Sequence, residues 1–282
     1  MSRIGTPVER ALACAMLAGV SLPASGRAQD RFFPHVRSFE LPSASPRVHG
    51  LVARVLGIST GESRFGSGNE AEVALGEHFP LLTLRRGATP IVLGFGPEVY
   101  GRFSLSDSKT SLISNDWLVS LAATLLGHSW DVTLEMSHES SHLGDEYANR
   151  FGAQRLDWSR ETAAAWAAYR HSGWRISGTV SYALIDELRL DPAAAGLGLD
   201  FDARAGEVHG GHVRPVAGIF LEAAGQTAWK ISSTARLGLG LRSDDLSRAI
   251  AISLIAHDGL SSQRQFYGNQ SRYAGVELRL DL

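Results

Sequence analysis

The sequence contains one cysteine, Cys14, and only two lysines, Lys109 and Lys230, in 282 residues. A single cysteine excludes an internal disulfide framework. The formal net charge of −2 gives no basic surface, so we do not expect nucleic acid as a partner. With 44% hydrophobic residues, the chain carries too much apolar surface for an intrinsically disordered protein.

Long apolar runs are also missing, because nothing after residue 28 approaches the roughly 18 residues of a membrane-spanning helix. A basic start, with Arg3 and Arg10, precedes a short apolar run, which is typical of a signal peptide. We therefore expect residues 1–28 to be a signal peptide. We expect the proline-containing residues 29–48 to form an extended periplasmic lead-in.

The rest of the chain alternates between apolar and polar residues. In residues 229–242, Leu237, Leu239 and Leu241 occupy odd positions, whereas the even positions are polar or glycine. A side-chain period of two predicts β-strands with one apolar and one polar face.

About twelve segments show this alternation, and most exceed the roughly 5–6 residues typical of strands in soluble proteins. Their length suits strands that cross a membrane at a steep tilt. The segments are roughly 49–58, 70–84, 90–104, 112–126, 128–142, 158–170, 174–187, 196–206, 215–225, 228–242, 248–258 and 272–282.

Tight connections alternate with long ones, as in outer-membrane barrels. The last strand resembles the carboxy-terminal assembly signal of such barrels, which implies the outer-membrane assembly machinery as a partner. We predict an all-β fold: an antiparallel transmembrane β-barrel of about twelve strands over residues 49–282, in the bacterial outer membrane. The alternative is a soluble exported β-sandwich or small barrel.

A transmembrane barrel also predicts where two further sets of side chains lie. Aromatic residues near strand ends are candidates for the interfacial girdles: Trp117, Trp130, Trp158, Trp174, Trp229 and Tyr273. Charged residues on the polar face are expected in the lumen: Glu98, Arg102, Glu135, Arg175, Arg236 and Arg242.

One segment departs from the pattern. Its even positions begin with the apolar residues 132, 134 and 136, and continue with His138, Ser140 and His142. These three polar side chains would face lipid near the outer rim, which is costly and calls for a function.

The first interpretation is nucleophilic catalysis. His138 and Ser140 share a strand face, as a Ser–His pair requires. The neighbouring strand carries Glu161 on the same face, and Glu161 is the candidate that would orient His138. Ser159 and His142 are the alternates.

The second interpretation is zinc, since residues 138–142 match His-Glu-x-x-His. That motif needs a helix, and in a strand Glu139 points away from both histidines; we therefore expect no metal site. The third interpretation is structural: polar residues at the rim contact lipid headgroups or loop backbone, with Asp145, Glu146 and Arg160 beside them.

The His138-x-Ser140 motif resembles outer-membrane phospholipase A and the lipid A deacylase, which are barrels with membrane-facing serine-hydrolase sites. The resemblance implies Ser140 as nucleophile and His138 as base. It is local, because the phospholipase pattern His-x-Ser-Asn-Gly is not kept: Ser141 and His142 follow.

A second resemblance covers most of the mature chain, including Phe32 to Pro34 and Ser159 to Glu161. The segment His-Glu-Ser-Ser-His-Leu-Gly-Asp-Glu, residues 138–146, is similar to a bacterial barrel family known only as a domain of unknown function.

Two functions stay open from the sequence. One is a membrane-facing serine esterase that acts on phospholipid or lipid A acyl esters; the other is a non-enzymatic structural barrel or narrow channel. No cofactor is expected, although Arg160, or a calcium ion near Asp145, is a candidate for stabilising an oxyanion. Membrane lipids or lipopolysaccharide are the expected partners, and the chain would be a monomer or a homodimer.

Overall fold

The fold is known from a computed structural model, which describes residues 31–34, 36, 39–61, 68–86, 89–208, 210–243 and 249–281. The expected signal peptide, residues 1–28, lies outside the described residues. Among the described residues, no helix is long and apolar enough to span a bilayer.

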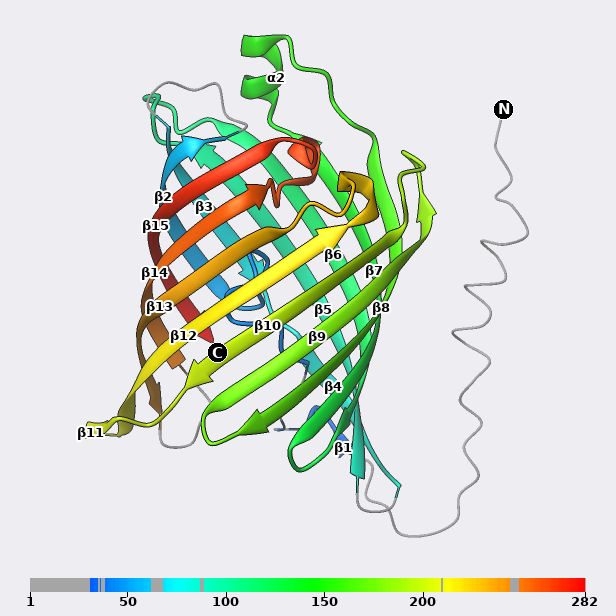
Figure 1. The fold of residues 1–282 in the computed structure, drawn as a ribbon, viewed down its shortest axis with the longest axis vertical. Helices are drawn as coiled ribbons and strands as arrows, with labels where there is room; N and C mark the ends of the chain where they lie inside the picture. Colours follow the sequence, from blue (N-terminus) through cyan, green and yellow to red (C-terminus); the bar gives the residue numbers. More distant parts are fainter. Residues whose placement is uncertain are drawn as a thin grey trace.

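The chain forms a closed antiparallel barrel of tilted strands (Figure 1). Twelve wall positions are occupied, with β3 and β4 sharing one, since both pair with β5. The wall strands are β2 (Leu51–Thr60), β3 (Asn69–Gly76), β4 (Phe79–Arg86), β5 (Thr89–Ser104), β6 (Leu112–Leu126), β7 (Trp130–Leu143), β8 (Trp158–His171), β9 (Trp174–Asp186), β10 (Ala193–Asp202), β12 (Gly211–Ala224), β13 (Ser232–Ser243), β14 (Ala249–Leu260) and β15 (Gln270–Asp281).

The barrel closes through the pairing of β15 with β2. Two short strands are added to this wall: β1 (Arg31–Phe32) pairs with β4, and β11 (Gly206–Val208) pairs with β12. The prediction of an all-β barrel of about twelve antiparallel strands is confirmed.

The strand expected over residues 70–84 is interrupted between β3 and β4. The interruption lies where β2 begins, at the bond from the Gly50 amide to the Gly76 carbonyl. Beyond that point β4 has no β2 backbone beside it and pairs with β1 instead. His78, in the interruption, is buried.

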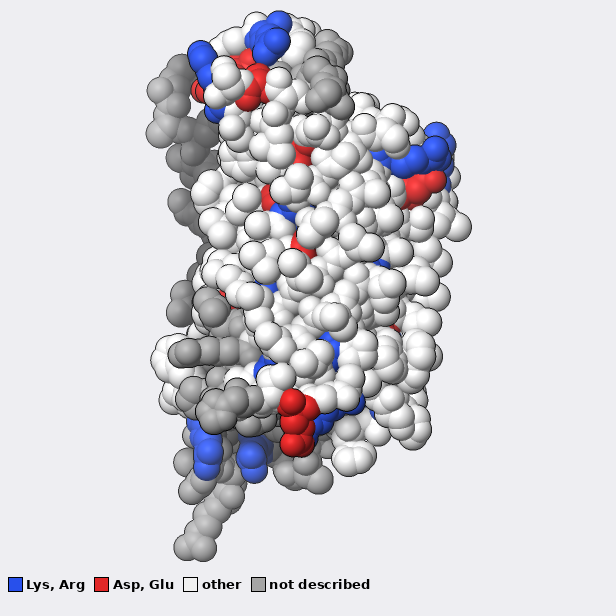
Figure 2. Space-filling model, turned by 90° about the vertical axis from the view of Figure 1, so that its left-hand side faces the viewer, with Lys and Arg blue, Asp and Glu red and all other residues white. Residues whose placement is uncertain are grey.

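The distribution of side chains is the reverse of that in a soluble protein. Leu237, Ile252 and Leu254 are 63%, 59% and 64% exposed, whereas Arg54 and Glu277 are 1% and 0% exposed. Apolar side chains outside and paired charges inside are what a bilayer and a polar lumen require. In Figure 2, charged side chains gather toward the two ends of the outer surface, with only small charged spots between them.

Most of the predicted girdle tryptophans lie on the outer surface, about half exposed: Trp117, Trp130, Trp174 and Trp229. The prediction is wrong for Trp158 and Tyr273, which are each 3% exposed. Trp158 packs under the guanidinium groups of Arg160 and Arg264 instead of facing lipid.

Part of the expected periplasmic lead-in lies inside the barrel. Its backbone is held by inward-facing side chains: the Ser43 amide donates to Asp200 at 2.9 Å, and Arg279 donates to the Ser43 carbonyl at 2.9 Å. Phe39, Ala44 and Val48 are buried. The segment is drawn inward because the lumen offers partners for its backbone.

A second segment, residues 261–269, folds into the lumen from the opposite end. Ser261, Gln263 and Gln265 are buried there, and Gln263 accepts a 2.8 Å hydrogen bond from Ser114 of β6. The segment connects β14 to β15, whereas the lead-in enters where β2 begins. Alternating strand direction puts these two points at opposite ends of the barrel.

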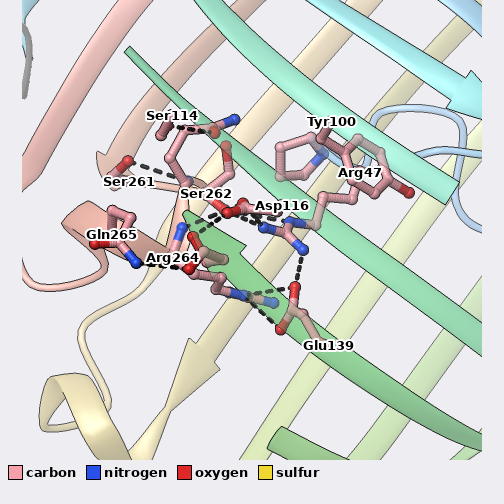
Figure 3. Close-up of polar contacts among 12 residues, drawn as sticks. Arg47, Tyr100, Ser114, Asp116, Glu139, Ser261, Ser262, Arg264 and Gln265 are labelled. Carbon is pink, nitrogen blue, oxygen red and sulfur yellow. Dashed lines mark hydrogen bonds and ion pairs between the residues drawn. The ribbon is translucent and has the colours of Figure 1, made fainter. Parts of the chain in front are cut away.

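The two segments meet at Arg47. Its guanidinium donates to Asp116 of β6, to Glu139 of β7 and, at 2.8 Å, to the Ser262 carbonyl (Figure 3). It also lies over the Tyr100 ring, 5.1 Å from its centroid. The lead-in, the wall and the 261–269 segment are therefore joined by one side chain.

We predict that Arg47→Ala lowers the free energy of unfolding by about 3–5 kcal/mol, because it strips a buried cation from two carboxylates. Arg204→Ala is the matched control, since Arg204 pairs with Glu207 at the exposed surface; its effect should stay below about 1 kcal/mol. Urea unfolding in detergent, followed by tryptophan fluorescence, measures both. Equal effects of the two substitutions would contradict the role given to Arg47.

Candidate functional site

The outer face of β7 and β8 carries a hydrogen-bonded histidine and carboxylate. His138 and Glu161 are register partners on these adjacent strands. His138 Nδ1 and Glu161 Oε1 lie 2.7 Å apart, and the two side chains are 48% and 39% exposed. Strand alternation puts both on the same side of the wall as Leu134 and Ala163, which is the lipid-facing side.

Ser140 and Ser159 form the next register pair on the same face. Both are half-buried. Among the hydrogen bonds of the described residues, none joins Ser140 Oγ to His138. The structure thus brings together the predicted base and orienting acid, and it leaves the predicted nucleophile beside them without a direct bond.

Trp117 indicates how deep in the membrane the residues around Ser140 lie. It lies on β6 directly opposite Ser140 and is 51% exposed on the outer surface. Tryptophan is enriched at the boundary between hydrocarbon and headgroups. The site is therefore flanked by a side chain typical of the membrane interface.

The remaining predicted residues are spread around the rim. His142 is exposed on the same face of β7. Asp145 and Glu146 begin α2 (Asp145–Phe151), which projects from one end of the barrel (Figure 1). Asp145 forms an exposed ion pair with Arg155. Neither acidic residue is brought to Ser140 by a described contact.

Arg160 faces the inside of the barrel, which excludes it as an oxyanion donor for Ser140. It pairs with Asp186 at 3.2 Å and donates to the Asp191 carbonyl at 3.1 Å. Asp191 belongs to the connection between β9 and β10, so Arg160 ties the inner face of β8 to that connection. Its neighbours Ser159 and Glu161 point the other way because residues alternate in a strand.

The wall behind the site is held by charges that the sequence analysis missed. Glu139, which lies between His138 and Ser140 in the chain, points inward and is 6% exposed. Arg264 Nε lies 3.0 and 2.9 Å from its two carboxylate oxygens, and Arg47 binds it from the other side (Figure 3). The sequence contained one indication of this ion pair: a glutamate whose side chain points into the lumen needs a buried cation as its partner.

Asp116 completes this inner group. It accepts hydrogen bonds from Ser141 and Arg47 and, at 3.2 Å, from the Arg264 amide. Glu139 and Ser141 therefore fix, from inside, the stretch of β7 that carries His138 and Ser140 outside. We name Arg47, Asp116, Glu139, Ser141 and Arg264 the inner clamp.

The same geometry argues against zinc at the His-Glu-x-x-His segment. All five residues are in β7, where four residues span about 13 Å, so His138 and His142 are too far apart to share one ion. Glu139 is engaged by two arginines on the opposite face. Among the described residues, no group of three or more metal-ligating side chains comes together.

Comparison with solved structures identifies barrels with a similar fold. Outer membrane phospholipase A from Escherichia coli matches over 86% of this chain and 94% of that chain, with 15% identity and a TM-score of 0.52. The dimer of the Salmonella typhi outer membrane phospholipase with bound calcium matches over 88% and 94%, with 15% identity and a TM-score of 0.55. LpxR from Salmonella typhimurium matches over 83% and 100%, with 14% identity and a TM-score of 0.44.

At these identities the likeness shows the fold alone, which is that of outer-membrane β-barrels. No curated relative matches the chain by sequence. One family model does match, over residues 38–281, and its description is "Protein of unknown function (DUF1207)". Because this match covers nearly all of the barrel, the chain belongs to the DUF1207 family.

Proposed function

We propose that this barrel hydrolyses acyl esters of membrane lipids, phospholipid or lipid A, at the His138–Glu161 pair. The observation that carries the proposal is the 2.7 Å contact between Nδ1 and Oε1 on a lipid-facing surface. Two exposed titratable groups in that position are costly without a chemical role. A carboxylate that orients an imidazole beside a serine is the arrangement of a serine hydrolase.

The contact with Glu161 orients the His138 imidazole so that it can act as a general base. A proton on Nδ1 is held by Glu161, which leaves Nε2 with a free lone pair. Nε2 then takes the Ser140 proton as Oγ attacks the ester carbonyl, and rotation of the Ser140 side chain toward His138 brings the two groups together. The lipid alcohol leaves with that proton, and water splits the acyl-serine to release a fatty acid.

The depth of the site suits an ester substrate. The ester groups of a lipid lie between its acyl chains and its headgroup, at the boundary where tryptophan is enriched. Because Trp117 lies opposite Ser140, we place the site at this same depth in the membrane. The fold is shared with outer membrane phospholipase A, one structure of which is an active-site mutant; this likeness adds to the proposal without assigning any residue.

The second candidate is a non-enzymatic structural barrel, and the filled lumen favours it over a narrow channel. Phe39 to Val48 and the 261–269 segment occupy the interior and are joined through Arg47 and Ser262. Paired charges then replace the water of an open pore. Such a barrel would stabilise the membrane and would neither conduct nor hydrolyse lipid.

Ser140→Ala is expected to lower fatty acid release from mixed phospholipid and lipid A by at least about 10³-fold, because the nucleophile is removed. Release is measured by mass spectrometry on the purified barrel in detergent. Ser233→Ala, on β13, is the matched control and should keep full activity. No release by the wild type, or equal release by Ser140→Ala, overturns the proposal as stated; loss confined to Ser159→Ala would move the nucleophile to Ser159.

Glu161→Gln is expected to slow the same reaction by about 10²–10⁴-fold, because an amide neither fixes the imidazole tautomer nor stabilises its charged form. The fall should appear in kcat, with KM little changed, since Glu161 does not bind the acyl chain. Unchanged kcat would show that the pair is structural.

In planar bilayers, we expect the wild-type barrel to show no steady single-channel current, because both ends of the lumen are filled. A porin of known conductance serves as the positive control. A steady current would favour the channel instead.

A further inference from the structure

The outer face of β8 is nearly bare of side chains below Glu161. Its outward positions are Ala163, Ala165 and Ala167. The strands on either side rise above it: Leu134 of β7 is 62% exposed, and Tyr182 of β9 is 54% exposed. These alanines form the floor of a trough, and the larger side chains form its walls.

At Ala163 and Ala165 the trough is part of a hollow of about 1210 Å³ on the outer wall. The hollow is lined almost entirely by apolar side chains of β4 to β9 and reaches Phe32 and Phe33, which are 77% and 73% exposed. On the far wall, β13 and β14 present Leu237, Leu239 and Ile252 instead of alanine. The exposed alanines of these two strands, Ala235 and Ala256, pair with each other across the strands and do not form a run along either strand.

The trough leads directly into the candidate site. Ala163 pairs with Met136, and the next outward pair along the strands is Glu161 with His138. From Ala167 to Glu161 the chain advances six residues, or about 20 Å. At a strand tilt of about 40° this is about 15 Å of depth, half of the roughly 30 Å hydrocarbon core.

We propose that the trough of Ala163, Ala165 and Ala167 binds one acyl chain of a lipid, with its ester group beside Ser140 and His138. The occupant follows from the position: the face is apolar, it contacts the hydrocarbon of one leaflet, and it ends at the polar pair. The inference rests on the proposed function and adds a specificity site to it. The walls select for a chain long enough to fill the trough.

Ala165→Phe tests the site because it fills the trough about four residues, or about 13 Å, from Glu161. A palmitoyl chain extends that far and a butyryl chain does not. We expect hydrolysis of the palmitoyl ester to fall at least about tenfold and that of the butyryl ester to stay within about twofold. Ile252→Phe places the same ring on the far wall and should change neither rate.

A second measurement does not depend on hydrolysis. A phospholipid with a photoactivatable diazirine in its acyl chain is incorporated with the Ser140→Ala barrel, irradiated, and mapped by peptide mass spectrometry. Label should be enriched on residues 163–167 over the β13–β14 wall, and Ala165→Phe should remove the enrichment.

The outcomes separate the two proposals. Enriched label without any hydrolysis by the wild type supports the trough and overturns the esterase. Hydrolysis with an unchanged chain-length profile and even labelling supports the esterase and overturns the trough. A dimer that Ala165→Phe converts to a monomer, with chain-length profile and label unchanged, assigns this face to a second copy and also overturns the trough.

Discussion

The alternation of side chains along a strand that separates lipid from lumen is the constraint on which this structure depends. In a bilayer every backbone amide and carbonyl must be paired, which a closed barrel achieves. Each wall residue then faces either hydrocarbon or the interior. Leu237 outside and Arg236 inside, adjacent in the chain, show how strictly the two environments are divided. A polar residue on the outer face, such as His138, is an exception against this background.

The same alternation couples the two faces of the site. Glu139 is bound inside by Arg47 and Arg264, and its chain neighbours His138 and Ser140 lie outside. The inner clamp therefore limits movement of the strand segment that carries the candidate base and nucleophile. Because Arg47 comes from the lead-in, a residue of the amino-terminal segment contributes from inside the lumen to the rigidity of the outer surface at His138 and Ser140.

The sequence predicted the strands, their number and their two faces, because a period of two is local information. It also placed His138 and Glu161 on one face, since parity alone decides that. It did not predict that Phe39 to Val48 fill the lumen: this segment has no alternation, and its partners, such as Asp200 and Arg279, are distant in the chain. The break between β3 and β4 was missed for a similar reason, as it depends on where β2 begins. The separation of Ser140 from His138 depends on side-chain rotation, which residue spacing does not determine.

The central claim is that the lipid-facing group at His138, Ser140 and Glu161 is chemically active. Labelling of the membrane-embedded barrel with an apolar phosphonylating reagent, followed by mass spectrometry of the modified peptide, tests it most directly. The account predicts a covalent adduct on Ser140 that is lost in His138→Asn, because the histidine activates the hydroxyl. An unmodified Ser140, or equal labelling in His138→Asn, would contradict it.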